Sequence, residues 1–292
     1  DYSKGGRPPY DYVLMFKILV LQHFYNISDD QTEFCIHDRF SFMQFLDLKL
    51  GQRVPDAKTI WHFKNELARE DMVSKLFEKL YRQLLNDGII INKGSIVDAS
   101  FVNVPKQRNS REENEQIKGG QQPGDWSAEK ARQKDLDAAW TKKNNETHYG
   151  YKDHVKVDAD TKLVTGYEVT DASVHDSQML DELLGEEDKK IYADSAYRSH
   201  EQEERLAAEG IKSEIMEKGV RNKPLTKRQM QRNKKKSRIR VRCEHVFGFM
   251  TNSMNGMFIR SIGMVRAKLA IGIKNLTYNL FRLMQLNIQL NA

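Results

Sequence analysis

A short apolar stretch that stops at an acidic residue constrains this chain most. Residues 189–194, with the sequence KKIYAD, read as a strand that ends at Asp194, and the small residues Ser195 and Ala196 lead into a turn and a helix. Sites in domains built from strands and helices collect at the carboxyl edge of the sheet. The stretch therefore predicts a site around Asp194 in a domain of mixed strands and helices.

Two further acidic residues match Asp194. Asp98 interrupts the strand-like run of residues 94–102, and Glu244 opens an apolar helical run after a basic one. A buried carboxylate without a partner is costly, so Asp98 predicts a cation beside it. Each residue also has an ordinary interpretation. Asp194 can cap the following helix, and Glu244 can pair with Arg240 one helical turn earlier.

The order of the expected elements indicates the fold. From residue 94 the patterns read strand, strand, strand, helix, strand, helix, strand, helix. This is the layout of an RNase H-like domain in an α+β (mixed α/β) chain. Three carboxylates brought together would form an oxygen-rich site suited to Mg²⁺. Two such ions, roughly 4 Å apart, activate a water or a sugar hydroxyl and stabilise the leaving oxygen of a phosphoryl displacement.

The first part of the chain predicts helices only. Apolar residues recur at helical spacing over 11–25 and 56–86, and Ser28 and Gln31 have the spacing of a capping box. The segment 58–64 fits a helix-turn-helix, in which Lys58, His62 and Lys64 would face DNA. A bundle that only packs or dimerises explains these helices equally well.

This pattern divides the chain into two regions. We expect a helical, helix-turn-helix-like DNA-binding region over 1–88 and a catalytic domain over 89–292. The catalytic domain would carry a polar insertion at 103–147, which need not be structured, and a C-terminal helix.

Positive charge is concentrated in one segment. The chain has 47 Lys and Arg against 41 Asp and Glu, and residues 218–242 hold twelve of these cations and no acid. An unmixed run of this kind favours contact with a polyanion, with a disordered basic loop as the alternative. The DNA-contact candidates in this run are Lys234, Lys235, Lys236, Arg238, Arg240 and Arg242.

Several other functions are disfavoured. Cys35 and Cys243 lack metal-site spacing and fit a reducing cytosol. The most apolar segment, 12–21, is too short to span a membrane.

Adjacent His175, Asp176 and Ser177 cannot form a hydrolase triad, and Asp176 or Ser177 is expected to cap the next helix. Trp126 and Trp140 lie in the insertion, where packing is the ordinary role and contact with a DNA end the alternative.

A family resemblance covers nearly the whole chain. Its motifs are PDAKTIWHFKNEL at 55–67, VDASFV at 97–102, THYGYKDHVKVD at 147–158, VTDASVHDSQML at 169–180, YADSAYRS at 192–199 and RVRCEHVFG at 240–248. With these motifs the chain resembles a DDE transposase of bacterial insertion sequences, in the group of the family numbered five. The resemblance implies that Asp98, Asp194 and Glu244 are the catalytic, metal-binding triad and that Arg240 contacts a phosphate.

The resemblance also implies an activity and its partners. Such an enzyme binds the terminal inverted repeats of its element in double-stranded DNA, cuts a strand to free a 3′-hydroxyl and directs it at target DNA. It would use two Mg²⁺ ions, for which Mn²⁺ can substitute, and act as a homodimer or higher oligomer at the nucleoid in the bacterial cytoplasm. The alternatives are a transposase-derived DNA-binding protein without cleavage activity and a stand-alone RNase H-like nuclease.

Overall fold

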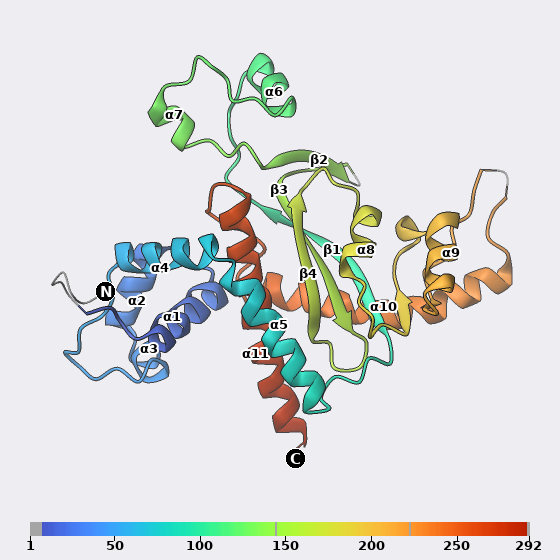
Figure 1. The fold of residues 1–292 in the computed structure, drawn as a ribbon, viewed down its shortest axis with the longest axis horizontal. Helices are drawn as coiled ribbons and strands as arrows, with labels where there is room; N and C mark the ends of the chain where they lie inside the picture. The colour runs from blue at the N-terminus through green and yellow to red at the C-terminus, as the bar shows by residue number, and fades with distance from the viewer. Residues whose placement is uncertain (1–7, 144, 222, 291–292) are drawn as a thin grey trace.

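A mixed sheet lies at the centre of the computed structural model, which describes residues 8–143, 145–221 and 223–290 (Figure 1). The strands are β1 (Ser95–Asn103), β2 (Ala139–Lys143), β3 (Glu146–Asp158), β4 (Val164–Asp171), β5 (Lys190–Tyr192) and β6 (Lys212–Ser213). Their order is β2-β3-β1-β5-β6, and β4 pairs with β3. Strands β1, β5 and β6 are parallel, whereas β3 is antiparallel to β1 and to β4. The α+β, RNase H-like fold is confirmed, and the predicted strands and helices occur in the predicted order, with β2 as an additional strand.

Helices cover both faces of this sheet. One face carries α10 (Lys227–Asn252) and α11 (Met264–Leu290). The other carries the short helices η2 (Asp176–Met179), α8 (Leu180–Leu183) and η3 (Ser195–Tyr197), together with α9 (His200–Ala208). Since both faces are covered, β3 is buried along most of its length, as central strands between two helical layers are.

Alternate residues of β3 contact the elements on the two faces of the sheet. Asp153 contacts Asn275 of α11 on one face. On the other face, the buried ammonium groups of Lys152 and Lys156 pair with Asp176 at 2.8 Å and with Asp188 at 2.7 Å. A buried charge requires such a partner, so these pairs fix the loops that carry η2 and β5 against the sheet.

The N-terminal region is helical, as predicted. Its helices are α1 (Tyr12–Tyr25), α2 (Asp29–Asp38), α3 (Phe40–Phe45), α4 (Ala57–Arg69) and α5 (Met72–Asn86). The capping box of Ser28 and Gln31 is confirmed, and the Asp56 side chain caps α4 by accepting from the backbone N–H of Thr59 at 2.7 Å. Gly88, with a φ of +67°, ends α5 in the left-handed conformation that glycine adopts without strain.

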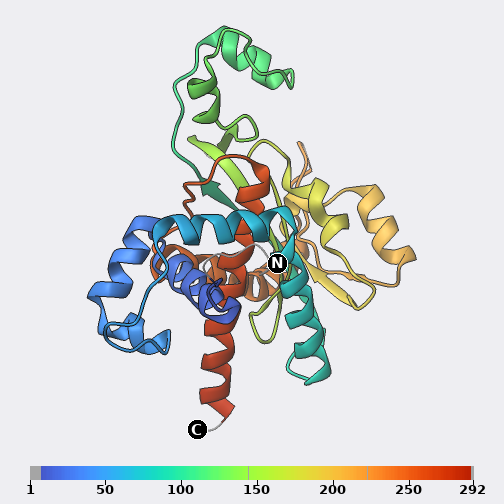
Figure 2. The same cartoon turned by 60° about the vertical axis from the view of Figure 1, so that its left-hand side comes forward.

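Helix α11 connects this region to the sheet, because it packs against α1, α4 and α5 on one side and against β4 on the other (Figure 2). A single apolar cluster contains Ile18 and Ile60 of the N-terminal helices together with Ile271 and Ile273 of α11. The division of the chain at residue 88 stays a prediction, since this core runs across it.

The insertion at 103–147 is more ordered than its polar sequence suggested. It contains α6 (Arg111–Lys118) and α7 (Ala128–Arg132), which project from the sheet, and β2, which extends the edge of β3 (Figure 1). The Trp126 ring is 8% exposed, and its Nε1 donates to Glu113 at 2.6 Å, so this ring holds the insertion together. Trp140 on β2 is 42% exposed. Within the described ranges, no helix is both long and apolar enough to cross a bilayer.

Candidate active site

Parallel pairing of β1 with β5 places two of the predicted acids together. Ser95 lies opposite Ile191, and Ile96 lies opposite Tyr192. Asp98 and Asp194 each follow two residues after the second pair. Neighbouring strands lie about 4.8 Å apart, so both carboxylates emerge at the same edge of the sheet. Asp194 also caps η3 by accepting from the N–H of Ser195, so its capping role and its place in the site coexist.

The Asp98 carboxylate is mostly enclosed. Burial raises the pKa of Asp98, and the negative charge of Asp194 raises this pKa further. Two donors oppose that shift: Arg240 Nη2 lies 3.0 Å from Asp98 Oδ2, and the N–H of Ala99 lies 2.9 Å from Oδ1. Two neighbouring carboxylates, one of them poorly hydrated, form a site that a cation would stabilise.

Arg240 has a different partner from the one its spacing suggested. The helical ion pair between Arg240 and Glu244 does not form. Instead the guanidinium reaches across to Asp98, with Nη1 lying 3.6 Å from the sulfur of Met216. The Nε of Arg240 is buried without a hydrogen-bond partner among the described residues. Arg240 therefore occupies Asp98 Oδ2, a carboxylate oxygen of the kind that a cation would bind.

Glu244 lies one turn further along α10, and its side chain is exposed. The neighbouring Cys243 is fully buried. Its thiol pKa is raised first by burial and then by the charge of Asp98, so α10 passes close to Asp98 at this point. In the parts of the chain that the structure describes, no three His, Cys, Asp or Glu side chains are arranged to hold a metal ion. The structure thus joins Asp98 and Asp194, while the Glu244 carboxylate lies apart from them.

The basic run is helical in its second half. Residues 227–242 belong to α10, which excludes a disordered loop for this part of the run. Lys234, Lys235 and Arg238 are exposed, and no ion pair involves them within the described ranges. Lys236 is held by the carbonyl of Ile215 at 2.9 Å.

Arg242 is also held internally, by the carbonyl of Ala159. Of the six predicted DNA contacts in the basic run, three therefore carry charge that is available to a partner: Lys234, Lys235 and Arg238.

The three predicted DNA contacts on α4 also differ in their exposure and pairing. Lys58 and His62 are exposed. Lys64 is half-buried and its ammonium pairs with Asp29 of α2, so this side chain links two helices.

One neighbour of the site went unrecognised in the sequence. The hydroxyl of Tyr197, three residues after Asp194, is buried without a hydrogen-bond partner in the described structure. Burial raises the Tyr197 pKa, and the charges of Asp98 and Asp176 raise it further, so the hydroxyl stays protonated beside the acids. Its only sequence signal is its place in the SAYR motif.

The cap of η2 was also predicted wrongly. His175 fills this position, with its Nδ1 accepting from the N–H of Ser177. Asp176, which was expected to be a cap, instead accepts from Lys152.

A sheet in this order, with one acid in β1 and a second just after the adjacent strand β5, defines an RNase H-like catalytic domain. Comparison with family models agrees: residues 92–280 match the model described as Transposase DDE domain, and residues 1–66 match Transposase domain (DUF772). No solved structure gives a significant match. The chain belongs to the DDE transposases of bacterial insertion sequences and is a DNA transposase. Membership of the family numbered five stays a prediction.

Proposed function

We propose that this transposase cuts DNA at the terminal inverted repeats of its element with Asp98, Asp194 and Glu244 as its catalytic acids. The observation that carries the proposal is the register of β1 and β5, which sets Asp98 beside Asp194 at the sheet edge. Glu244 follows on the helix that passes this edge, one turn from the residue that contacts Asp98. The triad requires the Glu244 carboxylate to turn from solvent toward Asp98 and Asp194.

The donor set fits a hard divalent cation, because all three candidates offer carboxylate oxygens. Two Mg²⁺ ions, or Mn²⁺ in their place, would supply Lewis acidity for attack on a phosphodiester by water or by a 3′-hydroxyl. Asp98 and Asp194 would hold the metal from the strands and Glu244 from the helix. The close approach of Asp98 and Asp194 supports this assignment, since their mutual repulsion is relieved by positive charge.

Arg240 has two roles in this proposal. In the structure it neutralises Asp98 through the 3.0 Å contact. With the Asp98 carboxylate engaged by a divalent cation, the Arg240 guanidinium would be free to bind the phosphate beside the cleaved bond through two parallel hydrogen bonds.

Three exposed cations of α10 would extend the phosphate contact of Arg240 along the DNA backbone. Lys234, Lys235 and Arg238 lie on the same helix as Arg240 and are exposed without internal partners in the described ranges. We assign them to phosphates of the element end. Lys58 and His62 on α4 are assigned to the terminal repeat itself. Transposition joins two element ends to a target, so the working unit is a homodimer or a higher oligomer, acting at the nucleoid in the bacterial cytoplasm.

The test uses a DNA fragment that carries the two ends of the element. With Mg²⁺, wild-type protein is expected to produce strands with free 3′-hydroxyls and to join them to a target plasmid. Glu244→Gln is expected to bind the fragment and lose cleavage by at least 10²-fold, on the order of 3 kcal/mol of transition-state stabilisation. Glu209→Gln, an exposed change on the distant end of α9, is the matched control.

Two outcomes would contradict the proposal. Cleavage that survives in Glu244→Gln would remove Glu244 from the site. Specific binding without cleavage by the wild-type chain, in Mg²⁺ and in Mn²⁺, would favour a transposase-derived DNA-binding protein.

A further inference from the structure

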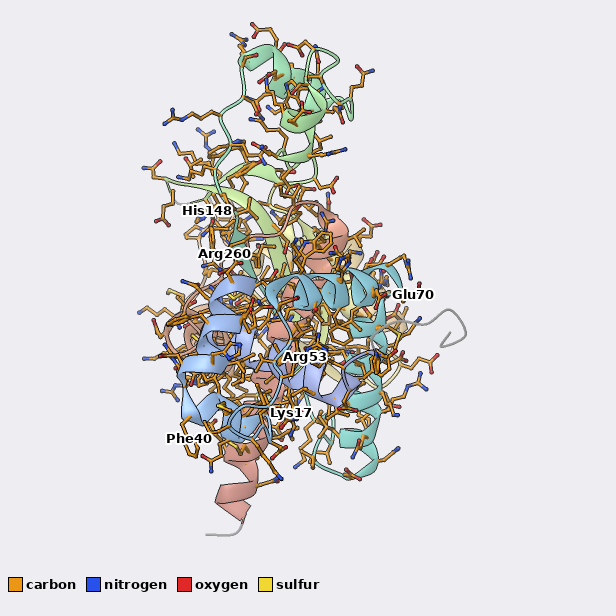
Figure 3. All side chains as sticks on the ribbon, turned by 90° about the vertical axis from the view of Figure 1, so that its left-hand side faces the viewer. Lys17, Phe40, Arg53, Glu70, His148 and Arg260 are labelled. Carbon is orange, nitrogen blue, oxygen red and sulfur yellow. The ribbon has the colours of Figure 1, made fainter. Side chains whose placement is uncertain are left out.

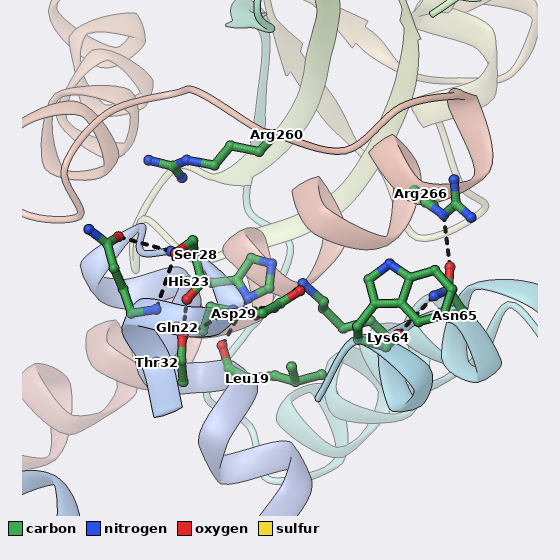
Figure 4. Close-up of polar contacts among 12 residues, drawn as sticks. Leu19, Gln22, His23, Ser28, Asp29, Thr32, Lys64, Asn65, Arg260 and Arg266 are labelled. Atoms are coloured by element: carbon green, nitrogen blue, oxygen red, sulfur yellow. Dashed lines mark hydrogen bonds and ion pairs between the residues drawn. The ribbon is translucent and has the colours of Figure 1, made fainter. Parts of the chain in front are cut away.

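A pocket lies between the N-terminal helices and residues 258–270, which comprise the end of the connection from α10 and the first turns of α11 (Figure 4). Trp61, Lys64 and Asn65 of α4 line one side, and Arg260 and Arg266 line the other. Arg260 stands between the N-terminal helices, which carry Lys17 and Phe40, and the sheet, which carries His148 (Figure 3). The two regions of the chain thus build this pocket jointly.

The two arginines carry charge that no acid neutralises. Arg260 Nη1 donates weakly to the carbonyl and the side-chain oxygen of Asn26, at 3.3 and 3.4 Å. Arg266 Nε donates to Asn65 Oδ1 at 2.8 Å. Neither guanidinium forms an ion pair within the described residues. Elsewhere on the surface, arginines such as Arg82 pair with an acid.

The acids in the pocket do not cancel this charge. Asp29 lines the pocket but is engaged by Lys64, and Asp30 is the other acid in the lining. Three cations therefore face two carboxylates. Buried Lys274 lies close enough to Arg260 to feel its positive charge, which acts with burial to lower the pKa of Lys274 to about 8. The pocket attracts an anion.

Trp61 supplies an aromatic surface at the same place. It is 46% exposed, although it is one of the largest apolar side chains of α4. Its ring packs edge-on against His62, at 5.0 Å between centroids. Exposed aromatic rings beside guanidinium groups are the elements with which proteins hold single bases of nucleic acids, since every base can stack on a ring.

His23 adds a neutral acceptor. Burial lowers the pKa of His23 to about 3, so the ring is uncharged. Its Nδ1 lies 2.9 Å from the carbonyl of Leu19 and therefore carries the hydrogen. The ring's other nitrogen, turned away from Leu19 in Figure 4, is then an acceptor of the kind that can bind the exocyclic amine of a base.

We propose that this pocket binds one nucleotide of the DNA that has left the double helix. Trp61 stacks on the base, while Arg260 and Arg266 bind the adjoining phosphates. A paired base shows only its edge to a protein, so a stacking pocket selects a base that is flipped out or lies in a single strand. The inference rests on the proposed function only in that DNA is the substrate.

The test measures binding in EDTA, where no cleavage occurs, by fluorescence anisotropy with a short single-stranded oligonucleotide and its duplex. Trp61→Ala is expected to weaken single-strand binding about 5- to 100-fold, the loss of one stacked base. Trp61→Phe keeps an aromatic face and should retain most of the affinity. Trp140→Ala, which removes a similarly exposed ring on β2, is the control and should change affinity less than twofold.

The arginines are tested by salt dependence. In the double variant Arg260→Ala and Arg266→Ala, the slope of log affinity against log salt should fall by about 1.4, or about 0.7 for each phosphate of a single strand that the protein no longer neutralises. Arg82→Ala should leave the slope unchanged, since Arg82 is already paired with Glu78.

Equal single-strand affinity of Trp61→Ala and Trp140→Ala would overturn the inference. So would an unchanged salt slope in the double arginine variant. Far-ultraviolet circular dichroism of each variant shows that the fold is retained. These results are separate from the catalytic proposal, because they are obtained without metal and the cleavage assay depends on Asp98, Asp194 and Glu244.

Discussion

Tyr197 near Asp98 and Tyr151 in β3 both bury a hydroxyl, with opposite consequences. The Tyr197 hydroxyl lacks a hydrogen-bond partner in the described structure, whereas the Tyr151 hydroxyl lies 2.8 Å from each oxygen of Asp135. An unsatisfied buried group costs about 1–3 kcal/mol. Tyr197→Phe is therefore expected to keep or raise the free energy of unfolding, whereas Tyr151→Phe should lower it by about 1–3 kcal/mol. Urea denaturation measures both, and a clear loss of stability in Tyr197→Phe would mean that its hydroxyl is bonded.

Individual residues of the site could be predicted better than their contacts. Asp194 was identified from a strand that stops at an acid and Asp98 from an acid inside a strand-like run, and pairing of β1 with β5 brings them together. The partner of Arg240 could not be predicted. Helical spacing shows that Arg240 and Glu244 share a face of α10, but only the tertiary fold sets Asp98 opposite that face.

Two helical glycines test how closely α11 approaches its neighbours. A Cβ at Gly272 would lie 2.3 Å from the hydroxyl of Tyr167 and 2.8 Å from a methyl of Val73, whereas a Cβ at Gly248 of α10 would meet nothing within 4 Å. Gly272→Ala is expected to destabilise the fold by about 1–3 kcal/mol through overpacking. Gly248→Ala should stabilise it by about 0.5–1 kcal/mol through helix propensity. Thermal unfolding of the two variants gives the comparison, and equal shifts would contradict the close packing of α11.

The contact between β3 and α11 predicts a dependence of stability on pH. Burial raises the pKa of Asp153 to about 7, while Asn275 Nδ2 donates to its Oδ1 at 3.1 Å. The unfolded carboxyl has a pKa of about 3.9. Between pH 4 and pH 7 the folded chain holds a proton on Asp153 that the unfolded chain has released. The stabilisation of the fold by this proton is therefore fully present below pH 4 and is lost as pH rises through about 7.

Replacing Asp153 by asparagine tests this contact. Asp153→Asn keeps the shape of the side chain and removes the charge. The variant should match or exceed the wild type in free energy of unfolding at pH 8. Between pH 4 and 7 its free energy of unfolding should fall less than that of the wild type, by on the order of a few kcal/mol. Asp125→Asn, at an exposed position, should leave the decline unchanged. Identical pH profiles of Asp153→Asn and the wild type would contradict the raised pKa.

Elements that owe their structure to distant partners were the ones missed. Strand β2 has a polar sequence, AWTKK, and is a strand because it pairs with the end of β3. The start of α10 was recognisable in principle. Thr226 and Gln229 form a capping box, and this spacing is visible in the sequence. Because of the dense positive charge that follows, a disordered loop was the alternative interpretation of this segment.

At the scale of the whole molecule, the order of strands and helices along the chain was sufficient to predict the fold class, because few topologies satisfy that order. The arrangement of the N-terminal helices was not predictable. The apolar stripe of α11 shows that the helix is buried, but not that α1, α4 and α5 cover one side of it and β4 the other. The nucleotide pocket beside Trp61 depends on this packing, so the sequence alone could not reveal it.

The most direct test of the catalytic site is Mg²⁺-dependent nicking of DNA that carries one end of the element, measured together with binding of the same DNA. Asp194→Asn should bind with wild-type affinity and lose nicking by at least 10²-fold, on the order of 3 kcal/mol. Asp181→Asn, which changes a surface acid on α8, should cut as the wild type does. Equal nicking by Asp194→Asn and the wild type would contradict a catalytic site at Asp98 and Asp194.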